Sequence, residues 1–210
     1  MDPKRAMYEK LGASVVEALE KRHFSAQYCA SSQEAKAAVL ALIEPGKTVG
    51  WGGSVTVDAL GVKEVLRERK QPIVDRQTAK SPWEADELMK KAMMADVFLM
   101  SSNAISTDGC LVNLDGRGNR VAALIYGADK VIVVAGMNKV VPTVEDAIVR
   151  TRNVAAPMNA QRFGKTVCCQ TGRCMDCKSP DSICANLVIT RLNRVPGRIH
   201  VILVGEDLGM

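Results

Sequence analysis

Aromatic residues are scarce in this sequence, at 4% of its 210 residues, although 47% of the residues are hydrophobic. With so few large rings, the core must be built from Val, Ile, Leu, Ala and Met. A chain of this length buries enough apolar surface to fold without disulfide bonds. The composition is typical of buried parallel strands that are covered by Ala-rich helices.

Long apolar segments are also absent. The most apolar stretch, 131–137, is followed at once by Asn138 and Lys139, and no segment approaches the roughly 20 residues that span a bilayer. Residues 1–5 lead into an amphipathic helix without the apolar core of a signal peptide. We therefore expect a cytoplasmic protein without membrane insertion, in which the seven cysteines do not form structural disulfides.

Clustered basic residues are missing too. The formal net charge is +5, but Lys and Arg are scattered along the chain and do not alternate with aromatic residues. We expect no nucleic-acid partner, because such binding calls for a continuous basic stripe or interleaved aromatics. The modest positive charge is explained either by a solvated surface or by a small anionic metabolite as partner.

Histidine is nearly absent. His23 lies at the end of an expected helix, and His200 lies in the last expected strand. Neither belongs to an arrangement that would support Ser-His-Asp or Cys-His catalysis, so these hydrolase mechanisms are excluded.

The chain does contain a regular alternation of strand and helix patterns. This spacing predicts βαβ units and one α/β domain over residues 1–210, a three-layer sandwich with a mainly parallel sheet. The expected strands are 25–29, 47–51, 72–75, 96–101, 111–116, 130–135 and 199–204. The expected helices are 2–23, 31–43, 55–69, 81–95, 119–127 and 143–155. A C-terminal Cys-rich loop, 166–184, interrupts the alternation, and a long irregular loop in a small domain is usually functional or mobile.

Five of the seven cysteines fall in this loop. Four of them have the spacing C-x4-C-x2-C-x6-C and are the predicted metal ligands: Cys169, Cys174, Cys177 and Cys184. Coordination of a metal offsets the entropy lost in ordering a loop that has no core of its own. Cys168 is an alternative to Cys169, because the two are adjacent and only one can easily point inward.

Two metals compete for these thiolates. Structural zinc usually binds two separated C-x2-4-C pairs, whereas here a single C-x2-C pair has one cysteine on either side. This arrangement favours a [4Fe–4S] cluster. Zinc, a reactive dithiol and an unligated set of thiols are the alternatives. Cys29 and Cys110 lie outside the loop and are predicted to be ordinary buried residues.

A second group of polar residues follows the ends of the expected strands. In open α/β sheets such ends gather at one edge, where ligands bind, and glycines at a helix start let backbone amides approach an anion. The predicted ligand-binding residues are Gly52, Gly53, Ser54, Asn103, Thr107, Asp108, Gly109, Asn113, Asn119, Arg120, Asn138 and Lys139. Taken singly, each is also explained by turn chemistry, and neither a P-loop nor a G-x-G-x-x-G motif is matched.

Three residues are candidates for catalysis if the protein is an enzyme. Glu145 or Asp108 would serve as a general base, with Lys139 as an electrophile. Glu145 lies in the first turn of an expected helix, where capping is its alternative role.

At these residues the sequence resembles the lactate-utilisation (LUD) domain family. The matching blocks are 50–54, 95–109, 111–120, 131–141 and 145–160. The resemblance implies a fold similar to the sugar-phosphate isomerase and coenzyme A transferase superfamily, which binds anionic ligands at loops that match 52–54 and 107–109. It also implies a link to oxidation of L-lactate to pyruvate in multi-subunit iron–sulfur systems. This chain has one cysteine loop where the larger lactate-utilisation subunit has tandem ferredoxin-type motifs.

The combined expectation is an iron–sulfur LUD-domain protein that binds a small anionic ligand. It would act in electron transfer for lactate or related organic-acid utilisation, as a homo-oligomer, with other redox subunits as partners. Two alternatives remain open. One is an isomerase or transferase for a phosphorylated or CoA-linked metabolite, with zinc as a structural metal. The other is a non-catalytic ligand sensor.

Overall fold

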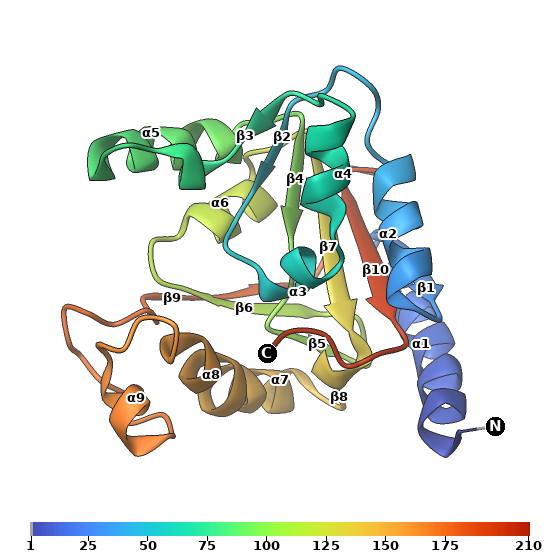
Figure 1. The fold of residues 1–210 in the computed structure, drawn as a ribbon. Helices are drawn as coiled ribbons and strands as arrows, with labels where there is room; N and C mark the ends of the chain where they lie inside the picture. Colours follow the sequence, from blue (N-terminus) through green and yellow to red (C-terminus); the bar gives the residue numbers. More distant parts are fainter. Residues whose placement is uncertain (1) are drawn as a thin grey trace.

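A six-stranded parallel sheet forms the centre of the computed structural model, which describes residues 2–210 (Figure 1). The strand order is β1-β10-β7-β4-β2-β3, and every neighbouring pair is parallel. The strands are β1 (Ser25–Cys29), β2 (Val49–Trp51), β3 (Ile73–Val74), β4 (Val97–Met100), β7 (Lys130–Gly136) and β10 (Ile199–Val204). The expected mainly parallel sheet is therefore confirmed.

Both faces of this sheet are covered by helices, which makes three layers. One apolar core joins the sheet to α1 (Pro3–Lys21), α5 (Pro82–Met93) and α6 (Asn119–Ile125). The core on the other face includes α2 (Ser32–Ala41), α3 (Val55–Ala59) and α4 (Val62–Glu68). Burial from both sides explains why β7 consists almost entirely of apolar residues rather than alternating ones.

Local capping chemistry sets most helix starts. The Ser31 hydroxyl accepts a hydrogen bond from the Glu34 amide, and the Glu34 carboxylate accepts one from the Ala30 amide. Ser81 and Glu84 repeat this pattern at α5. The single helix expected over 55–69 is wrong, because Gly61 has a left-handed φ of +63° and separates α3 from α4.

A second, four-stranded sheet was not expected. Its order is β8 (Val140–Val141), β5 (Ala104–Ser106), β6 (Leu111–Asp115) and β9 (Asn186–Thr190). The expected strand 111–116 belongs to this sheet, where it is antiparallel to both neighbours. Figure 1 shows the second sheet lying across the ends of the parallel strands.

Helices on the second sheet complete the fold. They are α7 (Val144–Arg150), the π-helix η3 (Thr151–Ala155) and α8 (Ala156–Ala160). Thus the expected helix 143–155 continues to Ala160 through a π-turn. The remaining elements are η1 (Arg76–Thr78), η2 (Met137–Lys139) and α9 (Val167–Thr171), which lies within the cysteine loop. Across residues 2–210, no helix is both long and apolar enough to cross a membrane.

Candidate functional site

A cavity of about 480 Å³ lies where the ends of β2 and β4 meet the second sheet. Its walls come from the loops after these two strands, from the turn between β6 and α6, from η2, and from the segment around α8. Residues 180–183 of the cysteine loop form a further part of the wall. The site is thus assembled from segments that are far apart in the sequence.

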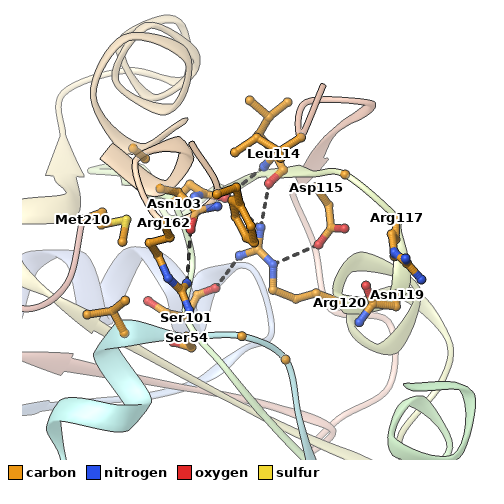
Figure 2. A pocket seen from close by; sticks show the side chains of 18 of the residues that line it. Ser54, Ser101, Asn103, Leu114, Asp115, Arg117, Asn119, Arg120, Arg162 and Met210 are labelled. Carbon is orange, nitrogen blue, oxygen red and sulfur yellow. Dashed lines mark hydrogen bonds and ion pairs between the residues drawn. The ribbon is translucent and has the colours of Figure 1, made fainter. Parts of the chain in front are cut away.

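Arg120, in the first turn of α6, holds the two sheets together at this cavity (Figure 2). Its guanidinium donates to backbone or side-chain oxygens of Ser101, Asn103, Asn113, Leu114 and Asp115, over 2.8 to 3.1 Å. These five bonds use every N–H donor that a guanidinium has. Burial lowers the pKa of Arg120, while the Asp115 carboxylate opposes that effect. Arg120 therefore contributes charge and rigidity to the site but has no free donor for a ligand.

Lys139 is the second buried cation of the cavity, and its residue surface is 3% exposed. Its Nζ donates to Thr56 Oγ1 at 2.8 Å and to Ser101 Oγ at 2.9 Å. It pairs with no carboxylate in the described part of the chain. Burial, followed by the charges of Arg150 and Arg120, lowers the pKa of Lys139 to about 7. A substantial fraction of this amine is therefore neutral near neutral pH.

Cationic side chains outnumber carboxylates around the cavity. The basic residues that line it are Arg76, Arg117, Arg120, Lys139 and Arg162, and the acidic ones are Asp115 and Asp181. Asp115 is already paired with Arg120 at 3.1 Å. Within residues 2–210, neither Arg76 nor Arg162 makes an ion pair. The arrangement favours a small anionic ligand.

The family follows from comparison with known proteins. The family model described as LUD domain matches residues 13–204. The chain belongs to the LUD domain family. Its fold is similar to that of a DUF162 family protein from Deinococcus radiodurans, with 16% identity, 95% of this chain and 98% of that chain covered, and a TM-score of 0.52.

A second solved structure matches this LUD domain over a shorter length. It is a D-ribose-5-phosphate isomerase in complex with phospho-erythronic acid, with 19% identity, 52% of this chain and 53% of that chain covered, and a TM-score of 0.36. No curated protein matches the sequence.

The LUD domain brings seven of the twelve residues predicted to bind a ligand to the cavity wall: Gly52, Gly53, Ser54, Asn103, Asn119, Arg120 and Lys139. Asn113 is fully buried and accepts a hydrogen bond from Arg120, so it supports the site without lining it. The side chain of Asn138 accepts from the Leu208 amide at 3.1 Å and is not part of the lining.

The turn that contains Thr107, Asp108 and Gly109 lies away from the cavity, because β5 and β6 are antiparallel and this turn is at the opposite end of β5 from Asn103. The Asp108 carboxylate pairs with Arg22, and the Ser106 hydroxyl and Arg22 together lower the pKa of Asp108. Glu145 is exposed on α7 and does not line the cavity. Of the three catalytic candidates, the structure brings Lys139 alone to the cavity wall.

Sequence reasoning misses three cations that line the cavity: Arg76, Arg117 and Arg162. Arg117 adjoins predicted residues in the turn after β6, and Arg76 follows the short strand β3, but neither is among the predicted residues. Arg162 follows α8, away from any glycine-rich or strand-end motif. Only the folded chain brings them to the site.

The cysteine loop of the LUD domain begins with α9. Cys168 is buried, and Cys169, Cys174, Cys177 and Cys184 are half-buried, all with free thiols. Among residues 2–210, no three His, Cys, Asp or Glu side chains are arranged to hold a metal ion. The expected buried positions of Cys29 and Cys110 are confirmed.

The loop thiols nevertheless differ in their surroundings. Burial raises the pKa of Cys184 to about 11, and charge on Cys168, Cys174 and Cys177 adds to that effect. Cys169 does not contribute, and its Sγ donates to the Ala160 carbonyl at 3.0 Å. Charge on Cys168 thus acts on Cys184, whereas Cys169 donates to α8; the Thr166 hydroxyl lies 3.1 Å from Cys168 Sγ and 3.3 Å from Cys169 Sγ.

Proposed function

We propose that this LUD-domain protein is a redox component of lactate or related organic-acid utilisation. It binds a small anionic metabolite in the cavity and carries an iron–sulfur cluster on the adjacent loop. The observation that carries the proposal is that one cationic cavity has part of the cysteine loop in its wall, at residues 180–183, immediately before Cys184. A ligand and a cluster would then be neighbours.

The anion is supported by the charges at the site. Buried cations are costly unless they are paired, yet within residues 2–210 the buried Lys139 has only hydroxyl partners. The exposed Arg162 adds a second cation, whose hydrogen bond in the described structure goes to the neutral Asn159. A ligand carboxylate or phosphate would supply the missing negative charge. The binding would therefore weaken as ionic strength rises.

Anion binding is tested by thermal unfolding with L-lactate, pyruvate or inorganic phosphate. An anion at about 100 times its Kd should stabilise the protein by about 2.7 kcal/mol. Arg162→Gln should weaken the binding about tenfold, because it removes a charged donor from the wall. The exposed Arg194→Gln, outside the cavity, is the matched control. Absence of stabilisation by all three anions would contradict the proposal.

The donor set suits an iron–sulfur cluster chemically. The loop contains five thiols: one C-x2-C pair, two cysteines before it and one after it. Thiolates are soft ligands of the kind that iron clusters take. Such a cluster, when bound, takes up and releases single electrons. Cys174, Cys177 and Cys184 would hold it, and the surroundings of the loop thiols favour Cys168 over Cys169 as the fourth ligand.

Anaerobic purification should yield a brown protein with about four irons per chain. Cys168→Ser should lose most of this iron and its EPR signal, whereas the neighbouring Cys169→Ser should keep both. The reverse result would return the role of fourth ligand to Cys169. Colourless protein with one zinc per chain would end the redox proposal.

One observation favours the alternative of an isomerase or transferase with structural zinc: Lys139 lies in the cavity with a pKa of about 7. That activity also needs a general base, and both Glu145 and Asp108 lie outside the cavity wall. The redox proposal has no such requirement and is preferred.

A further inference from the structure

Two buried lysines of this protein have opposite surroundings. Lys63 and Lys139 are 4% and 3% exposed. The Lys63 ammonium pairs with Asp58 at 2.5 Å and lies 4.9 Å from the centre of the Trp51 ring. Lys139 has no anionic or aromatic partner of this kind in the described structure; it contacts two hydroxyls. Lys63 thus has a carboxylate and an aromatic ring as partners, whereas Lys139 has two neutral hydroxyls.

Burial and neighbouring charges favour the neutral, nucleophilic form of the Lys139 amine. Burial disfavours the positive charge most, and Arg150 and Arg120 act in the same direction, so the pKa of Lys139 falls to about 7. Desolvation beside another cation is a known way to activate a lysine for attack on a carbonyl carbon. The lone pair is available at neutral pH because much of the amine carries no proton.

The neighbouring backbone shields this amine. A Cβ atom added at Gly209 would lie 3.2 Å from Lys139 Nζ and would collide with Thr56 Oγ1. The chain therefore passes directly over the amine, at a position with a φ of +66° that suits glycine. The open side of the amine is the cavity, which Lys139 lines together with Ser101 and Thr56.

Other cations of the same cavity are suited to a carboxylate. Arg162 lines the wall and donates one hydrogen bond, to Asn159 at 3.2 Å. Arg76 lies against Gly53, close enough that an added Cβ there would be 2.9 Å from its Nη2. Figure 2 shows the side chain of Arg162 in the same part of the pocket as Ser54 and Ser101. The cavity lining thus offers both guanidinium groups and an amine.

We propose that the cavity takes 2-oxo carboxylates and that Lys139 Nζ captures their carbonyl carbon as an imine. The inference rests on the proposed anion-binding function and names the ligand class of that site. A 2-oxo acid has the two groups that match the cavity: a carboxylate for the guanidinium groups and an electrophilic carbon for the amine. A hydroxy acid or inorganic phosphate fills the first role only.

The reaction is balanced without an oxidant or reductant. The neutral amine adds to the carbonyl carbon, and the carbinolamine then loses water. The C=N bond replaces the C=O bond, and the carbonyl oxygen leaves with both amine protons as water. The hydroxyls of Ser101 and Thr56, at 2.9 and 2.8 Å from Nζ, are placed to relay these protons.

The test is reductive trapping on the intact protein. Pyruvate with borohydride should give one stable adduct per chain, and peptide mapping should assign it to Lys139. L-Lactate should give none, because it has no carbonyl group on the corresponding carbon. Trapping should slow as the pH falls below about 7, since protonation removes the lone pair. Lys63→Arg should retain the adduct, and Lys139→Arg should lose it.

Thermal unfolding with pyruvate, run in parallel, separates the two proposals. If pyruvate stabilises the protein but no adduct forms on Lys139, or adducts form only on surface lysines, the imine is refuted and anion binding stands. If pyruvate, L-lactate and phosphate all fail to stabilise the protein and nothing is trapped, both proposals are refuted. Because the mapping uses the unmodified chain, the result does not depend on whether a lysine variant folds.

Discussion

Arg120→Met should lower the free energy of unfolding by about 3–5 kcal/mol, which is the usual cost of removing one partner from a buried ion pair. The side chains of Arg120 and Asp115 are 13% and 10% exposed. The substitution would leave the Asp115 carboxylate without its cation and would free the oxygens that Arg120 now bonds, among them the side chains of Asn103 and Asn113. Equilibrium unfolding in urea measures the change.

Two further variants make this prediction specific. Arg117→Met removes a nearby arginine whose exposed side chain pairs with Asp86, and it should cost no more than about 1 kcal/mol. Adding Asp115→Asn to Arg120→Met should recover about 1 kcal/mol, because the uncompensated charge is then gone. If Arg120→Met were no more damaging than Arg117→Met, the view of Arg120 as the link between the two sheets would be wrong.

Lys139→Met should change how stability depends on pH. The pKa of Lys139 is about 7 in the folded protein against 10.5 for an ordinary lysine, so between these values the unfolded chain holds a proton that the folded chain has lost. Where the unfolded state binds more protons, stability rises with pH. Over that range, Lys139 should therefore raise the free energy of unfolding of the parent by about 1.4 kcal/mol per pH unit. The methionine variant lacks this gain.

The quantity to measure is the difference in unfolding free energy between Lys139→Met and the parent, at several pH values from about 6 to about 10. The stability of the variant relative to the parent should be highest at and below about pH 7 and should fall as the pH rises above 7. Taking the difference cancels the titration of every other group. A difference that does not vary with pH would show that Lys139 keeps an ordinary pKa in the folded state.

Local patterns were enough to predict the parallel sheet and most helix starts. The apolar run of β7 identifies a strand buried on both faces, and the pairs Ser31–Glu34 and Ser81–Glu84 mark two helix starts. The alternation of these elements implies the three-layer arrangement. Each of these patterns involves only residues that lie close together in the sequence.

The second sheet is not predicted, because its pairing is long-range. Strand β9 is exposed at most positions and follows an irregular loop, and its partner β6 is distant in the sequence. The short strand β5 directly follows a polar turn and is only three residues long. This sheet decides that Asn103 lies at the cavity whereas Asp108, at the other end of β5, does not.

By itself the sequence determined the fold class, the strand-end position of the cavity-lining residues Gly52, Gly53 and Ser54, and the presence of clustered thiols in one loop. Periodicity, capping and spacing are properties of neighbouring residues and can be seen in the sequence. Only the tertiary structure decided that Arg120 uses all its donors to join two sheets and that Arg76 and Arg162 line the same cavity. It also decided that Lys139, among residues 2–210, contacts hydroxyls and no carboxylate. The reason is physical: burial and the field of distant charges depend on segments brought together by folding, and these set the chemistry of a side chain.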